Sequence, residues 1–144
     1  MTVVKTSGFF QRDSIEALNV LDLLNDFCIE LKAGGLVAIA DLRIAVHALQ
    51  LVFTSSPLAD RLVEPSILRA RASVEAFANQ SINATECARR LASATNEVRA
   101  LLKNELKPSA STSAELTLTN SSLALARSII LSLRKTLRKT SAGQ

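Results

Sequence analysis

The chain has few of the residues that supply turns, aromatic stacking or catalysis. Its 144 residues include no tryptophan or tyrosine, five phenylalanines, one histidine, two cysteines, four glycines and three prolines. So few glycines and prolines leave little turn chemistry for a chain of short strands, and long helices are expected instead. The shortage of aromatic side chains argues against binding unpaired bases by stacking.

Catalytic and metal-binding patterns are missing as well. His47 is the sole histidine, and no Cys-His or Ser-His-Asp signature accompanies it. We interpret His47 as a partly buried side chain beside Arg43. No cluster has metal-ligand spacing, and no glycine-rich phosphate loop is present. The sequence therefore predicts a protein that is not an enzyme, with no catalytic residue, metal, cofactor or small-molecule substrate.

Cysteine usage and hydropathy indicate the compartment. Cys28 and Cys87 fall on apolar helical stripes, where a free thiol behaves as a small hydrophobic group. The N-terminal stretch has no uninterrupted apolar signal region. The longest apolar run, 36–53, is interrupted by polar residues, so it is not expected to form a membrane-spanning helix. A reduced, cytoplasmic protein is expected.

Positive charge is concentrated at the C-terminus. The formal net charge is +4, but no acidic residue follows Glu115. Five basic residues lie beyond that point: Arg127, Arg134, Lys135, Arg138 and Lys139. The excess positive charge is therefore a property of the last segment.

Apolar periodicity predicts five helices. The first begins at Asp13, where Glu16 completes a capping box, and ends at the two glycines 34–35. The second covers 36–53. Pro65 is expected to force a break or a kink before a third helix over 66–79, and a fourth starts after Asn83. The fifth follows Leu116.

These helices define an all-α fold. We expect an antiparallel four-helix bundle with an additional basic C-terminal helix. The bundle occupies residues 1–106, the low-complexity segment 107–115 is a flexible linker, and 116–144 form a basic amphipathic helix and tail.

The last helix repeats Leu-Arg-Lys-Thr at 133–136 and 137–140. Its apolar stripe consists of Leu116, Leu123, Ala126, Ile130, Leu133 and Leu137. The basic residues Arg134, Lys135, Arg138 and Lys139 are candidate contacts for a membrane or a partner. A basic amphipathic helix of this kind can lie on anionic lipid, bind nucleic acid, or dock on the acidic face of the first helix, formed by Glu16, Asp22, Asp26 and Glu30.

A second basic group lies on the third and fourth helices. Its members are Arg69, Arg71, Arg89, Arg90, Arg99 and Lys103. Arginine suits phosphate because its planar guanidinium engages two oxygens at once. The same arginines are also typical of a solvated helix surface, where they would pair with Glu75, Glu86 or Glu97.

Short motifs in this region resemble a known family. They are Ser56-Pro57-Leu58, the pair Arg69 and Arg71, Arg89-Arg90, Ala94-Thr95 and Val98-Arg99, together with "RDSIEALNV" at the start of the first helix. This pattern is similar to the coat proteins of rod-shaped plant RNA viruses of the tobamovirus type. It covers roughly half of the chain.

The resemblance implies a helical-bundle subunit that assembles side by side into a rod and holds RNA with arginines. Arg69, Arg71 and Arg90 would then contact phosphates, with Arg89 and Arg99 nearby, and the protein would also be found in a virion. The chain differs from the family in its short 54–64 connection, which leaves no room for that family's small sheet. It also lacks the family's outer tryptophan and tyrosine, and its last helix is basic.

Two hypotheses follow. The first is a non-catalytic, self-assembling protein that binds RNA without sequence preference. The second is an interaction bundle whose basic C-terminal helix docks on an anionic membrane or an acidic protein.

Overall fold

The computed structural model describes residues 11–54, 56–106 and 113–142, and omits the side chains of residues 11, 12, 113–123 and 139–142. Over these ranges the chain is all-helical. The five helices are α1 (Gln11–Lys32), α2 (Ile39–Phe53), α3 (Pro57–Ala78), α4 (Ala84–Asn104) and α5 (Ser113–Ala142). The expected all-α fold class is confirmed.

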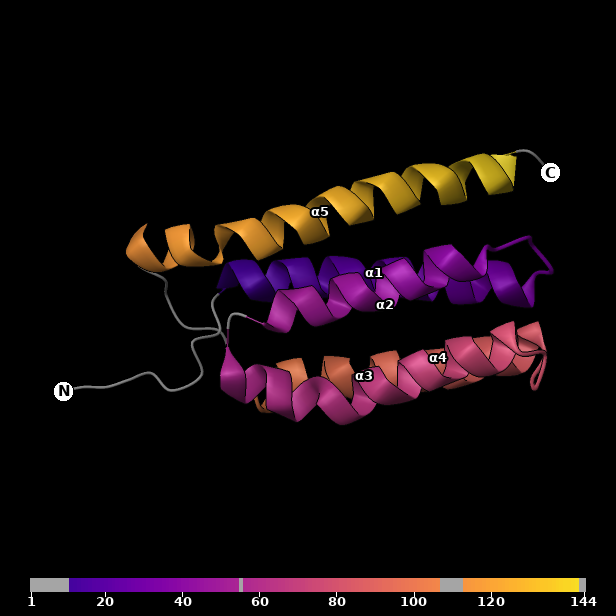
Figure 1. The fold of residues 1–144 in the computed structure, drawn as a ribbon, viewed down its shortest axis with the longest axis horizontal. Helices are drawn as coiled ribbons and strands as arrows, with labels where there is room; N and C mark the ends of the chain where they lie inside the picture. Colours follow the sequence, from indigo (N-terminus) through magenta and orange to yellow (C-terminus); the bar gives the residue numbers. More distant parts are fainter. Residues whose placement is uncertain (1–10, 55, 107–112, 143–144) are drawn as a thin grey trace.

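The helices lie in three layers, with α5 at the top of Figure 1, α1 and α2 in the middle, and α3 and α4 below. Consecutive helices from α1 to α4 contact one another, and α4 returns to contact α1. The fifth helix contacts α1 and α2. As a result α1 has three neighbouring helices, α2, α4 and α5.

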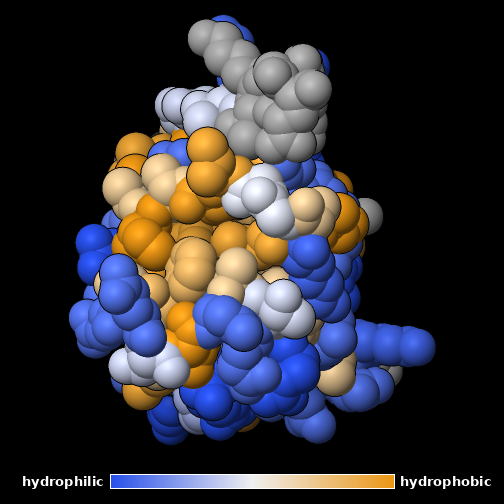
Figure 2. All heavy atoms as spheres, turned by 90° about the vertical axis from the view of Figure 1, so that its right-hand side faces the viewer, coloured by the Kyte–Doolittle hydropathy of each residue, from blue (hydrophilic) through white to orange (hydrophobic). Residues whose placement is uncertain are grey.

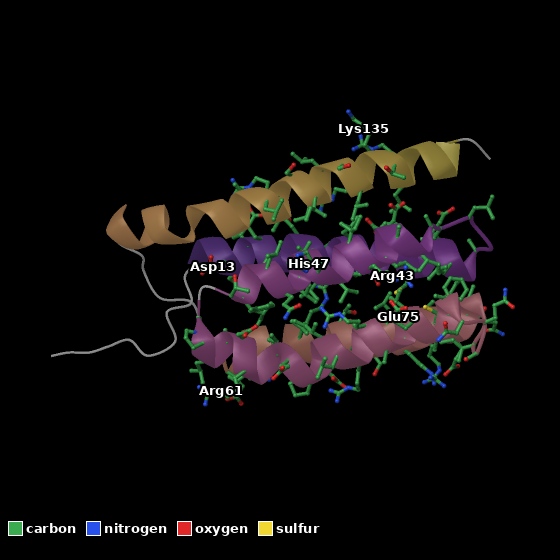
Figure 3. All side chains as sticks on the ribbon, in the orientation of Figure 1. Asp13, Arg43, His47, Arg61, Glu75 and Lys135 are labelled. Atoms are coloured by element: carbon green, nitrogen blue, oxygen red, sulfur yellow. The ribbon has the colours of Figure 1, made fainter. Side chains whose placement is uncertain are left out.

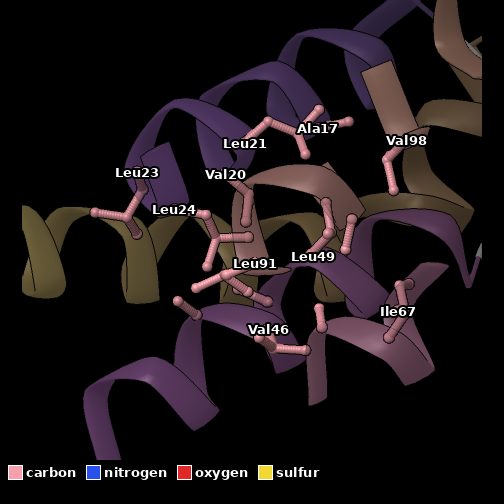
Figure 4. Packing of buried hydrophobic residues seen from close by; sticks show 14 of the residues in the cluster. Ala17, Val20, Leu21, Leu23, Leu24, Val46, Leu49, Ile67, Leu91 and Val98 are labelled. Carbon is pink, nitrogen blue, oxygen red and sulfur yellow. The ribbon is translucent and has the colours of Figure 1, made fainter. Parts of the chain in front are cut away.

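The core lies between these layers and follows the predicted apolar arcs. The apolar residues that recur at helical spacing along α1 are all buried: Ala17, Val20, Leu21, Leu24, Phe27, Cys28 and Leu31. Figure 4 shows Val20 and Leu24 of α1 converging with Leu49 of α2 and Leu91 of α4. On α5, Ala126, Ile130 and Leu133 are buried and Leu137 is partly buried. The side chains of Leu116 and Leu123 lie outside the described residues.

The start of α1 differs from the sequence prediction. The helix already includes Gln11, so Asp13 lies inside its first turn and is not the N-cap. Asp13 and Glu16 are both buried, and Glu30 is nearly so. The predicted acidic face is therefore divided: Asp22 and Asp26 are exposed, while α5 covers the side of α1 that carries Glu16.

The start of α2 and the break before the third helix were also predicted wrongly. The second helix begins at Ile39 and not at residue 36, since residues 34–38 belong to the connection from α1. The third helix runs continuously from Pro57 through Pro65. A proline inside a helix leaves the carbonyl four residues earlier without a donor. Arg61 and Pro65 are both exposed, so water can satisfy that carbonyl.

Side-chain or glycine caps define three of the helix ends in the part of the chain that the structure describes. Ser56 and Asn83 accept hydrogen bonds from the amides of Ala59 and Glu86, at 3.2 and 2.8 Å. The C-terminus of α1 is a Schellman motif with Gly34 at φ +85°. The fifth helix begins at Ser113, inside the segment expected to be a linker, and residues 107–112 lie outside the described ranges.

The C-terminus of α3 repeats this motif without glycine, since Gln80 has φ +63°. The Ser81 amide donates to the Ala76 carbonyl at 2.8 Å and the Gln80 amide to the Phe77 carbonyl at 3.1 Å. We predict that Gln80→Gly stabilises the protein by about 1 kcal/mol, because glycine adopts positive φ without strain. Thermal or denaturant unfolding measures the change. Gly34→Ala is the matched control and should destabilise the protein, and a destabilising Gln80→Gly would contradict the assignment.

A second prediction concerns the ion pair between α5 and α1. Arg127 donates from Nε and Nη2 to Oε2 of Glu16 at 2.8 and 2.5 Å. The Glu16 side chain is 7% exposed and that of Arg127 is 47% exposed. Arg127→Met should destabilise the protein by about 2 kcal/mol in denaturant unfolding, because it leaves a buried carboxylate without its cation.

The control for this change is Lys135→Met, which removes an exposed charge from the same helix and should alter stability by less than about 0.5 kcal/mol. Adding Glu16→Leu to Arg127→Met should recover most of the stability, since an apolar pair does not require a counter-charge. Equal stability of Arg127→Met and the wild type would show that the pair does not hold α5 in place.

Candidate anion-binding site

Three of the six predicted nucleic-acid contacts surround one hollow between α3 and α4. Arg69 of α3 and Arg89 and Arg90 of α4 line a cavity of about 280 Å³. The remaining lining residues are small: Ala72, Ser73, Ser93 and Ala94. Among the described residues, no carboxylate lines the hollow, and its charged groups are cations.

Capping and packing position these arginines. Asn83 caps α4 and starts it so that Arg89 and Arg90 lie in its second turn, beside the apolar face that begins with Cys87 and Ala88. Ala70 and Val74 are buried and hold α3 against its neighbours, which leaves Arg69 at the edge facing α4. Small side chains at 72, 73, 93 and 94 leave open space between the two helices.

The arginines of the hollow are paired with carboxylates that lie outside it. Arg69 binds Oε1 of Glu97, which also accepts a hydrogen bond from Ser66 at 2.9 Å. Arg89 binds Glu86 through Nε at 3.0 Å and through Nη2, and Arg90 binds the same carboxylate at 2.7 Å. One acidic residue therefore serves two arginines, and a local positive charge remains.

These pairs lie at the surface. The side chains of Arg69 and Glu97 are 57% and 41% exposed. Exposed ion pairs contribute at most about 1 kcal/mol, because water solvates both partners in their absence. An arginine of the hollow can thus exchange its carboxylate for a phosphate oxygen at little cost.

The other three predicted contacts point elsewhere. Arg71 lies in the middle of α3, two residues after Arg69, and donates to Oε1 of Gln50 on α2 at 2.7 Å. Arg99 donates to Asp22 of α1 at 2.8 Å. Lys103 is exposed further along α4 and makes no ion pair with a described residue. A helix beginning at residue 66 would have placed Arg69 and Arg71 near its start, but α3 begins at Pro57 and directs the two side chains to opposite sides.

The pairs that Arg69 forms with Glu97, and Arg89 and Arg90 with Glu86, agree with the solvated-surface interpretation. Glu75 instead pairs with Arg43, which was not among the six predicted contacts. Arg43 and Glu75 form a bidentate pair with distances of 2.7 and 2.8 Å, and Figure 3 shows them facing each other between α2 and α3. The spacing of Glu86 to Arg89 and Arg90 makes that pair readable from sequence. The partners of Arg69, Arg71 and Arg99 come from other helices, and no local signal marks them.

The basic residues of α5 divide into two sets. Arg134 and Arg138 line a hollow of about 350 Å³ together with Asp26 and Glu30 of α1. Lys135 points away from the other helices (Figure 3), and the side chain of Lys139 lies outside the described residues. The apolar stripe of α5 packs on α1 and α2. Of the three contacts expected for this helix (lipid, nucleic acid and the first helix), the structure contains the one with the first helix.

The single histidine and the two cysteines have the properties of structural residues. His47 is exposed on the uncovered side of α2, so its expected partial burial was wrong. Cys28 and Cys87 are buried free thiols. Burial, followed by the proximity of Cys87, raises the pKa of Cys28 to about 11, and burial raises the pKa of Cys87. Neither thiol is ionised near neutral pH, and the described residues contain no metal-binding cluster.

Comparisons with protein-family models, with curated proteins and with solved structures found no match to this chain. None of the helices, within the residues that the structure describes, is long and apolar enough to cross a membrane. The class defined by the structure is thus an all-helical protein of five described helices with a cationic hollow between α3 and α4.

A third prediction concerns the acid titration of this site. Hydrogen bonds from Arg89, then from Arg90, lower the pKa of Glu86 to about 2. Its ionised form therefore stabilises the folded state above its ordinary pKa near 4.5, and this contribution disappears as the pH falls toward 2. Carboxyl NMR should give a midpoint near pH 2 for Glu86, with Glu86→Gln identifying the resonance.

Replacing both cations should return the midpoint toward 4.5. The variant Arg89→Gln with Arg90→Gln removes both donors while leaving the carboxylate in place. If the midpoint stays near 2 in this double variant, another group must be responsible for the lowered pKa of Glu86.

Proposed function

We propose that this chain is a non-catalytic RNA-binding protein that contacts phosphates through the arginines of the α3–α4 hollow and assembles with copies of itself. In this proposal α1 to α4 form an antiparallel four-helix bundle, with α5 as an additional helix. The supporting contacts join each helix to the next and α4 back to α1. The resemblance to rod-shaped virus coat proteins motivates the assembly and, with it, a virion location in addition to the cytoplasm.

The observation that carries the proposal is the convergence of Arg69, Arg89 and Arg90 on one hollow that no described acid lines. Guanidinium groups from two helices can contact adjacent oxygens of one phosphate or successive phosphates of a strand. Ser93 supplies a hydroxyl donor in the same hollow, whereas the Ser73 hydroxyl donates to the Arg69 carbonyl at 2.9 Å. Such contacts read backbone charge and not base identity, which is what a protein that covers RNA of any sequence requires.

Self-assembly is supported by apolar side chains outside the core. Exposed isoleucines and leucines occur on α1, α2, α3 and α5: Ile15, Leu18, Ile44, Leu68, Leu125 and Leu131. Single exposed apolar residues are normal at a protein surface. Their presence on several sides of one small subunit suits lateral contacts with more than one neighbour.

The fourth prediction tests RNA binding directly. Fluorescence anisotropy with a single-stranded RNA of mixed sequence should show binding at low salt that weakens steeply as salt is added. Arg69→Gln with Arg90→Gln should lower the affinity, because two phosphate-binding cations are removed. The slope of log affinity against log salt should fall by about 0.7 for each phosphate that the variant no longer neutralises.

The matched control is Arg43→Gln with Arg61→Gln. It removes the same charge, from the carboxylate-paired Arg43 and from Arg61, at positions outside the hollow. It should change the slope much less. Absence of RNA binding at low salt, or equal effects of the two double variants, would overturn the proposed site. Negative-stain microscopy with and without RNA tests assembly, and dispersed particles in both samples would exclude the rod.

A further inference from the structure

The connection between α1 and α2 carries the most exposed large apolar side chain of the described residues. Leu36 is 86% exposed, and Ile29, one turn before the end of α1, is exposed as well. Val37 and Ile39 are partly buried beside them. Figure 2 looks at this end of the molecule and shows apolar side chains gathered at the height of the connection, bordered by hydrophilic ones.

The local sequence directs this segment outward. Gly34, with φ +85°, ends α1 and turns the chain away from the helix axis. Gly35 lies directly against the carboxyl group of Glu30, which occupies the space that a Cβ on residue 35 would need. From residue 33 to residue 40 the chain has no polar side chain. Surface connections are normally polar, so an apolar one requires a reason.

Basic side chains border this apolar connection. Lys32 precedes it and is exposed. Arg134 and Arg138 lie across the neighbouring hollow from Ile29 and beside Leu137. The acids at the same end are Asp26 and the buried Glu30 in that hollow, and Asp41 in the first turn of α2. The end of α5 adds no acid, because none follows Glu115 in the chain.

We infer that this end of the molecule binds the surface of an anionic lipid bilayer. Leu36 and Ile29 enter the interfacial region, while Lys32 and Arg138 contact headgroup phosphates. Exposed apolar side chains flanked by the exposed cations Lys32 and Arg138 match a surface in which anionic headgroups cover acyl chains. The insertion is shallow, through a connection and not through a spanning helix.

Charge favours lipid over a second copy of the chain. Two copies meeting symmetrically through this end would bring Lys32 and Arg138 of one copy toward the same residues of the other. Like charges at an interface oppose association, whereas anionic headgroups attract both. The buried apolar stripe of α5 is not required, so this contact needs no release of that helix from α1 and α2.

Vesicle co-sedimentation of the full chain tests the inference. Vesicles of phosphatidylserine and phosphatidylcholine in equal amounts should bind the protein, and vesicles of phosphatidylcholine alone should bind it much more weakly. Leu36→Ser should lower the partition coefficient about tenfold. Lys32→Gln with Arg138→Gln should lower it by about fivefold for each charge at low salt, with a smaller effect at high salt.

The controls match each change at a distant position. Leu68→Ser removes an exposed leucine from α3. Arg61→Gln removes one cation near the start of α3, at the end of the molecule opposite the α1–α2 connection (Figure 3), for comparison with the effect per charge. Both should bind vesicles as the wild type does. Circular dichroism melting verifies that each variant is folded. Arg69→Gln with Arg90→Gln should retain vesicle binding, which separates this surface from the RNA site.

Three results would overturn the inference. They are no binding to the anionic vesicles, equally weakened binding in Leu36→Ser and Leu68→Ser, and a vesicle-free oligomer in ultracentrifugation that Leu36→Ser dissociates. The last result would assign this end to contact between copies of the chain.

Discussion

The burial of α1 by three neighbouring helices is the constraint on which the rest of the structure depends. A helix covered by α2, α4 and α5 cannot keep all of its polar residues in water. The apolar positions of α1 supply the packing, but Glu16 and Asp13 are buried with them. A buried carboxylate needs a cation or hydrogen-bond donors, and α5 supplies Arg127 to Glu16. The basic character of α5 is thus partly a structural requirement of α1.

Helical periodicity decides which arginines can act together. Two residues separated by one position on a helix point about 200° apart. Arg69 and Arg71 therefore face α4 and α2 respectively, although they are adjacent in the sequence pattern. Arg89 and Arg90 lie close enough on α4 to share Glu86 and to meet Arg69 across the hollow. A cationic site arises where two helices with small facing residues leave space between them.

The structure separates three surfaces with different chemistry. The α3–α4 hollow is lined by cations and small residues, the α1–α5 hollow by both signs of charge, and the α1–α2 connection by apolar side chains. Phosphate of a nucleic acid suits the first surface and a lipid interface suits the last. The α3–α4 hollow shares no residue with the other two surfaces and can be altered without changing them, whereas Ile29 and Arg138 belong both to the α1–α5 hollow and to the proposed lipid-binding end.

Periodicity in the sequence determined that the fold is helical and which apolar stripes are buried, because apolar residues spaced three and four apart lie on one face of a helix. It also determined the Glu86 pairs, which lie within one turn. Only the tertiary structure decided that α3 passes through Pro65, that α5 covers Glu16, and that Arg69, Arg89 and Arg90 meet. Each of these depends on which helix lies beside which, and contacts between residues distant in the chain leave no local pattern in the sequence.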